Sequence, residues 1–178
     1  MFASPVIADS TVPEAAASID PEEVLVIEMD QGPIYVELLP DVAPLHVERI
    51  QTLAREGFYD GVVFHRVIDG FMAQTGDPTG TGTGGSALPD LPAEFSNVPY
   101  ERGVVGMART NDPNSANSQF FIMFGPAPSL NGQYTVFGRV VAGMDVVDAI
   151  EKGDMRRNGV VNEPDAMVRT RLLSDEAS

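Results

Sequence analysis

The chain has 178 residues, 43% of them hydrophobic, and a mean hydropathy near zero, which together fit a single compact globular domain. A formal net charge of −15 argues against nucleic acid as a partner, because binding to phosphates needs a basic surface. The absence of cysteine excludes disulfides and thiolate chemistry, and no apolar run approaches the roughly 20 residues that would make a membrane a partner.

The first twenty residues are rich in alanine, proline, serine and acidic residues. This composition predicts a disordered lead before one domain that spans residues 21–178. Residues 2–8 resemble the end of a secretory signal, because small residues precede Asp9 where such a signal would be cleaved. The stretch is either a trimmed signal, which would place the protein in the periplasm, or a chance match in a cytoplasmic protein.

Two short runs rich in β-branched residues, at residues 24–29 and 34–38, predict the first two strands, and residues 30–33 between them predict a hairpin turn. A helix follows. Pro44 fits its first turn, and Gly57 fits the cap at its C-terminal end.

The buried face of this helix is predicted from the spacing of Val47, Ile50 and Ala54. His46 falls off that face, so we expect it to lie in solvent. The only other histidine is His65, and the two show no metal-binding spacing. We therefore expect no metal site.

A predicted hairpin that begins near residue 64 carries the most informative residues. Arg66 lies on a half-apolar strand, where an arginine is costly unless its donors are used. Gln74, Phe71 and Met72 follow in the same hairpin. Such residues fit a site that holds an apolar ring and polarises an amide, although a structural salt bridge of Arg66 is the plainer alternative. His65 alternates with Arg66 and is expected to be a hydrogen-bonded structural residue.

The register of this hairpin can be predicted from the site that it must form. A two-residue turn at Asp69 and Gly70 would pair Arg66 with Ala73 and send Gln74 to the opposite face. A shared site needs Arg66 and Gln74 on one face, so we expect a three-residue connection at residues 69–71.

Glycines at positions 80, 82 and 85 formally match a dinucleotide-binding loop. Such a loop must open a helix, and the prolines within residues 88–92 forbid one. We therefore expect no nucleotide cofactor, and interpret the glycine run as the border of a groove.

The rest of the chain predicts more short strands. One of them places Gln119 and Phe121 on one face and Phe120 on the other, so Phe121 is expected to line a pocket with a polar rim. Many short strands with few helices predict a mainly β fold, a closed eight-stranded antiparallel β-barrel capped by two α-helices. The remaining elements are strands at residues 104–107, 119–123, 134–140 and 167–173, and a helix at residues 144–150.

Residues 24–173 resemble the cyclophilins, a family of peptidyl-prolyl cis–trans isomerases, and in particular their bacterial branch. The resemblance rests on four motifs in the family's order, at residues 64–74, 82–85, 106–108 and 118–122. The family fold is an eight-stranded antiparallel barrel with two helices, which agrees with the elements predicted above.

The resemblance implies roles for individual residues. Arg66 matches the catalytic arginine, and Gln74, also expected to be catalytic, matches a polar partner of the proline pocket. Ser129 stands where the family commonly has an aromatic residue, so we expect cyclosporin to bind weakly. Residues matched to substrate binding are Phe71, Met72, Ala108, Arg109, Gln119, Phe121, Leu130 and Tyr134.

By this resemblance the chain is an enzyme that accelerates rotation about Xaa-Pro bonds and assists protein folding, with no cofactor. Its partners would be proline-containing polypeptides, including unfolded and nascent chains, and we expect a monomer. The alternative is a chaperone module that binds proline-containing segments with little turnover. The presence of Arg66 favours the enzyme.

Overall fold

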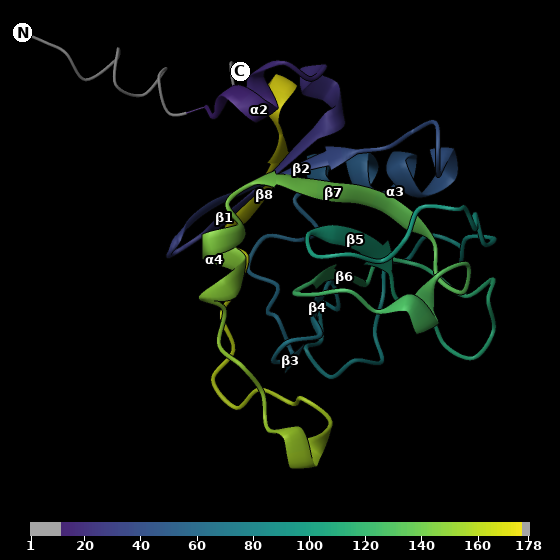
Figure 1. Cartoon of the computed structure of the whole chain (residues 1–178), viewed down its shortest axis with the longest axis vertical. Coiled ribbons are helices and arrows are strands. Elements are labelled where there is room, and N and C mark those ends of the chain that lie inside the picture. The colour runs from purple at the N-terminus through teal and green to yellow at the C-terminus, as the bar shows by residue number, and fades with distance from the viewer. Residues whose placement is uncertain (1–11, 176–178) are drawn as a thin grey trace, which may run out of the picture.

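The computed structural model describes residues 12–175, so the signal-like residues 2–8 lie outside the described part of the chain. Eight strands form one antiparallel sheet in the order β3-β4-β6-β5-β7-β2-β1-β8 (Figure 1). The protein is therefore mainly β, as predicted. The strands are β1 (Val24–Met29), β2 (Gly32–Leu38), β3 (Arg66–Ile68), β4 (Met72–Thr75), β5 (Val104–Met107), β6 (Phe120–Met123), β7 (Val136–Ala142) and β8 (Arg169–Leu172).

The sheet is curled, and its edge strands β3 and β8 are connected through the segments beside them. Phe64 N donates to Asp165 O at 2.9 Å, and Met167 N donates to Val62 O at 2.8 Å. These bonds join the residues before β3 to the residues before β8. The gap between the two edges is thus bridged locally.

The structure confirms the eight antiparallel strands predicted from the sequence, but it shows them as a curled sheet. Within the described residues, the pairing between β3 and β8 is not a continuous ladder. The reason is that β3 is only three residues long and its outer side is already occupied. Val67 accepts from Gly153 N and donates to Gly159 O, each at 2.8 Å. A hairpin at residues 153–160 therefore lies where a neighbouring strand would pair.

Among residues 12–175, three α-helices accompany the sheet: α2 (Glu14–Ala17), α3 (Pro44–Arg55) and α4 (Met144–Asp148). The predicted helix is confirmed in α3, which starts at Pro44 and is followed by Gly57 with a φ of +73°. No helix in residues 12–175 is long and apolar enough to cross a membrane.

Helix α2, which the sequence did not predict, corrects the predicted extent of the disordered lead. Residues 12–20 are described, and Ala16 in α2 is fully buried against Val24, Val26 and Tyr35. A small apolar side chain can pack closely on a strand surface, so this part of the lead belongs to the fold.

The sheet has an apolar cluster on each of its faces. The larger cluster lies under α3 and includes Phe120 and Ile122 of β6. The second lies on the opposite face and includes Phe121 and Met123. The alternation predicted for β6 is therefore confirmed, and the second cluster is the apolar base on which the site is built.

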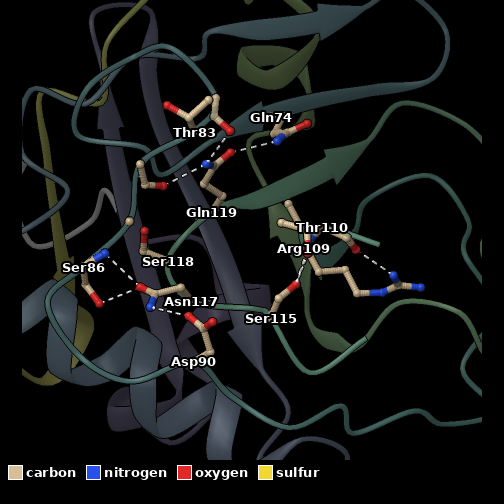
Figure 2. Close-up of a pocket in the computed structure, with 14 residues that line it drawn as sticks. Gln74, Thr83, Ser86, Asp90, Arg109, Thr110, Ser115, Asn117, Ser118 and Gln119 are labelled. Atoms are coloured by element: carbon tan, nitrogen blue, oxygen red, sulfur yellow. Dashed lines mark hydrogen bonds between the residues drawn. The ribbon is translucent and has the colours of Figure 1, made fainter. Parts of the chain in front are cut away.

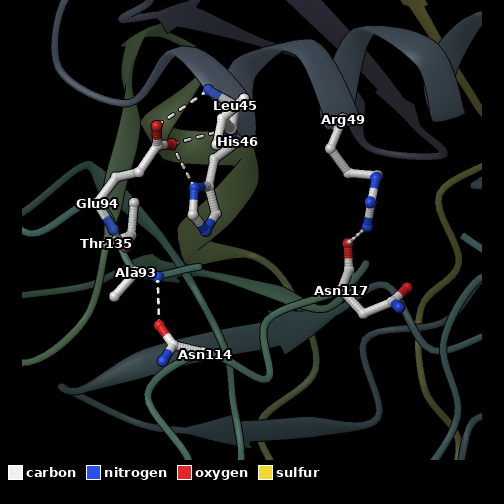
Figure 3. Close-up of polar contacts among 8 residues, drawn as sticks. All are labelled: Leu45, His46, Arg49, Ala93, Glu94, Asn114, Asn117 and Thr135. Carbon is white, nitrogen blue, oxygen red and sulfur yellow. Dashed lines mark hydrogen bonds and ion pairs between the residues drawn. The ribbon is translucent and has the colours of Figure 1, made fainter. Parts of the chain in front are cut away.

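The prediction that His46 lies in solvent is wrong, because the side chain is fully buried. Glu94 accepts from the backbone N of Leu45 and of His46, at 3.1 and 3.0 Å, and from His46 Nδ1 at 2.6 Å (Figure 3). A carboxylate from a distant loop thus satisfies the free N–H groups at the start of α3 and draws the imidazole inward.

Arg49, one turn further along α3, also bonds this helix to distant parts of the chain. Its guanidinium donates to Pro89 O at 2.6 Å. It also donates to Asn117 O at 3.1 Å (Figure 3). Because Arg49 is buried, these bonds tie the loop around Pro89 and the segment that leads into β6 to the core of the domain.

His65 is buried, as a structural residue would be, but it is not hydrogen-bonded as predicted. Neither of its ring nitrogens has a partner among residues 12–175. Burial lowers the pKa of His65 and of His46, because the charged imidazolium is disfavoured away from water.

The buried histidines predict that stability falls in mild acid. Above about pH 6.5 the imidazoles are neutral in the folded chain and in the unfolded chain. Below that pH the unfolded chain binds protons at these histidines, whereas the folded chain does not because burial lowers their pKa. The melting temperature should therefore drop between about pH 8 and about pH 5. His65→Phe should weaken this dependence, because it removes one titrating group that makes no hydrogen bond. A variant with the full wild-type pH dependence would contradict this account.

Candidate functional site

A cavity of about 230 Å³ opens on the face of the sheet that carries the second apolar cluster. Its lining includes every substrate-binding and catalytic residue predicted from the sequence except Gln119, which lines the adjoining cavity. The lining residues are Arg66, Phe71, Met72, Gln74, Ala108, Arg109, Phe121, Leu130 and Tyr134.

The hairpin places Arg66 and Gln74 as the sequence predicts. Arg66 lies opposite Gln74, and Ile68 lies opposite Met72, so residues 69–71 form a three-residue connection. Within this connection Phe71 N donates to Ile68 O at 2.9 Å. The register prediction is confirmed, and it leaves Phe71 outside the pairing of β3 with β4, where it lines the cavity.

The apolar base of the cavity is a set of packed rings. Phe121 meets Tyr134 edge to face, with ring centroids 5.9 Å apart, and stacks on Tyr100 at 5.7 Å. Gly106 of β5 makes room for this packing, since a Cβ there would lie 2.4 Å from Tyr100 Oη and 2.9 Å from Phe121 Cζ. A rigid aromatic floor of this kind suits an apolar ring as a ligand.

The guanidinium of Arg66 is held by three hydrogen bonds to neutral oxygens. Gln74 Oε1 accepts from Nη1 at 3.1 Å, while Asn158 accepts through its backbone O from Nε at 2.9 Å and through Oδ1 from Nη2 at 3.1 Å. Burial lowers the pKa of Arg66, with Tyr134 acting in the opposite sense. Arg66 takes no part in the ion pairs found among residues 12–175, so its charge is oriented without being neutralised.

Gln74 is itself held by Gln119, which connects it to the glycine loop. Gln74 Nε2 donates to Gln119 Oε1 at 2.9 Å, and Gln119 Nε2 donates to Gly82 O at 3.1 Å and to Gly84 O at 2.9 Å (Figure 2). The orientation of the Gln119 amide is therefore fixed by backbone carbonyls, and it fixes that of Gln74 in turn.

Asp77 organises the glycine loop from below. Its buried carboxylate accepts from the N and Oγ1 of Thr79, at 2.8 and 2.7 Å, and from the N of Gly82 and Gly84, at 2.6 and 3.0 Å. Burial by itself would raise the pKa of Asp77, but the hydrogen bonds from Gly84, Thr79 and Gly82 outweigh it and hold that pKa well below its usual value. The glycine run borders a groove, as expected.

A second cavity of about 540 Å³ adjoins the first and shares Gln74, Ala108 and Arg109 with it. Figure 2 shows that its lining is mostly polar. The additional lining residues are Gly82, Thr83, Gly84, Gly85, Ser86, Asp90, Thr110, Ser115, Asn117, Ser118 and Gln119.

Arg109 forms the partition between the two cavities. Its guanidinium lies 4.4 Å from the centroid of the Tyr134 ring and donates to Gln133 O at 3.1 and 2.6 Å and to Thr110 O at 2.9 Å. The side chain thus links two loops and supports the ring of Tyr134.

Sequence reasoning missed Asn158 and Asp77. Asn158 precedes a glycine, which indicates a turn, but nothing local indicates a contact with Arg66, 92 residues away. Asp77 lies between a strand and the glycine run, and this position could have predicted that its carboxylate accepts hydrogen bonds from that run. Among residues 12–175, no group of three or more His, Cys, Asp or Glu side chains could hold a metal ion.

Comparison with known proteins gives a consistent family. Residues 24–172 match the model described as cyclophilin type peptidyl-prolyl cis-trans isomerase/CLD. The chain is 53% identical, over 173 residues, to a probable peptidyl-prolyl cis-trans isomerase of Brucella suis, covering 91% of this chain and 88% of that one. It is 45% identical over 130 residues to peptidyl-prolyl cis-trans isomerase-like 3 of Rattus norvegicus, covering 71% of this chain and 80% of the relative.

Solved structures agree. A cyclophilin from Hirschia baltica superposes with a TM-score of 0.79 at 31% identity, covering 88% of this chain and 76% of that one. A cyclophilin type peptidyl-prolyl cis-trans isomerase of Cryptosporidium parvum, crystallised in the presence of the dipeptide Ala-Pro, superposes with a TM-score of 0.76 at 29% identity, covering 84% of this chain and 98% of that one.

The role of Asp77 predicts a stability loss in its alanine variant. Asp77→Ala should lower the free energy of unfolding by about 1–3 kcal/mol at neutral pH, because buried donors lose their acceptor. The difference from wild type should shrink below about pH 4: a depressed pKa gives stability that is present above the unfolded pKa and is lost as pH falls.

Urea unfolding at several pH values measures this effect. Asp41→Ala is the matched control, since Asp41 is an exposed carboxylate. Equal losses in the two variants would contradict the role given to Asp77.

Proposed function

We propose that Arg66 is the catalytic cation of this chain, which belongs to the cyclophilin-type peptidyl-prolyl cis-trans isomerases. The chain is thus an isomerase of Xaa-Pro peptide bonds. The proposal concerns how its residues act, and the observation that carries it is the guanidinium of Arg66, held on the edge of an apolar cavity by neutral acceptors.

The cavity suits the ring of a proline residue. Its base of Met72, Phe121 and Leu130 offers apolar contact, and its rim of Arg66 and Gln74 offers polar contact to the adjoining amide. The solved relative from Cryptosporidium parvum was crystallised in the presence of Ala-Pro, a dipeptide with the same ring. Proline-containing polypeptides are therefore the proposed substrates.

Catalysis requires that the prolyl amide lose its partial double bond, against a barrier of roughly 18–20 kcal/mol. As the bond twists, the nitrogen becomes pyramidal and gains electron density that a nearby cation stabilises. Because the nitrogen of the planar amide carries less electron density for the cation to stabilise, the interaction favours the transition state over the ground state. A million-fold acceleration corresponds to about 8 kcal/mol, which the charge of Arg66 and the fixed ring would share.

The adjoining polar cavity gives room for the substrate chain beside the proline. Its hydroxyl, amide and backbone groups can hydrogen-bond to an extended peptide without demanding one side chain. Such tolerance fits unfolded and nascent chains as clients, and we propose assistance to protein folding on this ground. The alternative, a module that binds proline-containing segments with little turnover, would use the same cavities without needing the charge of Arg66.

Replacement of Arg66 tests its proposed catalytic role. Arg66→Ala should lower kcat/KM for a proline-containing tetrapeptide at least about tenfold with the fold intact, because a charge used mainly in the transition state is lost. Circular dichroism checks the fold, and an isomerase assay measures the rate.

Arg139→Ala is the matched control, since Arg139 lies on the same sheet but is exposed and paired with Glu37 at 2.9 Å. It should keep activity within about twofold of wild type. Wild-type turnover as slow as that of Arg66→Ala would favour the binding module, whereas fast turnover by both proteins would contradict the role given to Arg66.

Cyclosporin provides a second test of the site. Ser129 lies exposed in a short 3-10 turn (Pro128–Leu130) directly before Leu130, which lines the cavity. Wild type should bind cyclosporin weakly, and Ser129→Trp should bind it more tightly, because an indole adds ring surface and an N–H donor. Calorimetry measures both affinities. Tight binding by the wild-type protein would refute this expectation.

A further inference from the structure

The guanidinium of Arg66 is held on the side away from Gln74 by one residue, Asn158. The backbone O of Asn158 accepts from Nε, and its Oδ1 accepts from Nη2. A guanidinium presents its donors in a rigid fork, so two acceptors from one residue fix both the position and the plane of the group.

Asn158 belongs to the hairpin at residues 153–160, which lies against the outer side of β3. Figure 1 shows this segment, in yellow-green, extending from α4 past β3 before the chain returns to β8. The hairpin is fastened to Val67, the residue next to Arg66, by the bonds with Gly153 and Gly159 described above. The acceptors for Arg66 are therefore anchored to the same strand as Arg66 itself.

The local backbone is shaped to present Asn158. Its φ is +59°, a left-handed conformation that asparagine tolerates better than most residues, and Gly159 follows with a φ of +85°. Gly159 N donates to Asp154 O at 2.8 Å, which closes the turn. A Cβ at Gly159 would lie 2.6 Å from Ile68 Cγ1, so the hairpin can approach β3 this closely only with glycine there.

We propose that Asn158 is a positioning residue of the isomerase: it orients the Arg66 guanidinium toward the proline cavity and, being neutral, leaves its charge available. The inference rests on the proposed role of Arg66. An aspartate at this position would offer acceptor atoms of the same geometry together with a negative charge. That charge would stabilise the cation in the ground state and offset its field at the substrate.

Two substitutions separate orientation from charge. Asn158→Gly keeps the left-handed backbone and removes Oδ1, and should lower kcat at least about threefold with little change in KM. Asn158→Asp keeps the size of the side chain and should lower kcat at least about tenfold, while the melting temperature stays equal to that of wild type or rises. A merely structural residue would not lose activity while keeping or gaining stability.

The same substitutions in the Arg66→Ala background complete the test. There they should lower the residual activity no further, because the group that Asn158 orients is gone. Asn162→Ala is the matched control: Asn162 is exposed just after the same hairpin, and its Oδ1 accepts from Arg157 Nη1 at 3.0 Å. It should keep activity within about twofold of wild type.

Wild-type kcat in both Asn158 variants would overturn the inference, as would equal losses with and without Arg66. If Asn158→Gly does not fold, Asn158→Asp decides alone. Failure of the inference is distinguishable from failure of the proposed function, because the second would appear as full activity of Arg66→Ala itself.

Discussion

The pairing of Arg66 with Gln74 across β3 and β4 is the constraint on which the rest of the site depends. Side chains alternate along a strand, so this register sends both residues to the outer face and sends Val67 and Ala73 into the main core. A slip by one residue would bury the guanidinium and expose the core residues. The burial of Val67 and Ala73 stabilises this register, and the register in turn places the Arg66 guanidinium at the cavity.

The site combines rigid apolar packing with a chain of polar contacts that begins far from the substrate. Asp77 fixes the glycine loop, the loop fixes Gln119, and Gln119 fixes Gln74. Each member satisfies a donor or acceptor of the next, so the orientation of the last amide is determined by the backbone carbonyls of the glycine loop. The negative charge needed to organise the loop is thereby kept at one end of the network, and the groups of residues 12–175 that accept hydrogen bonds from Arg66 are neutral.

Local pattern was sufficient to predict much of the structure. The strand alternation of β6, the bounds of α3 and the three-residue connection after Ile68 all follow from spacing and from residue types within one element. The burial of His46 and the contact of Asn158 with Arg66 do not, because their partners lie 48 and 92 residues away. The run of short strands predicted the curled antiparallel sheet but gave no sign of the hairpin that covers β3, because that hairpin has no strand pattern of its own.

That covering hairpin also bears on what happens when the protein meets chains that have not yet folded. An edge strand with free N–H and C=O groups is a template on which another polypeptide can add a strand, and incomplete proteins expose many such segments. The hairpin bonds to both backbone groups of Val67, at the middle of β3. A proline-containing chain that reaches the cavity therefore meets side chains rather than unpaired backbone groups at this edge, and it can leave without having been incorporated into the sheet.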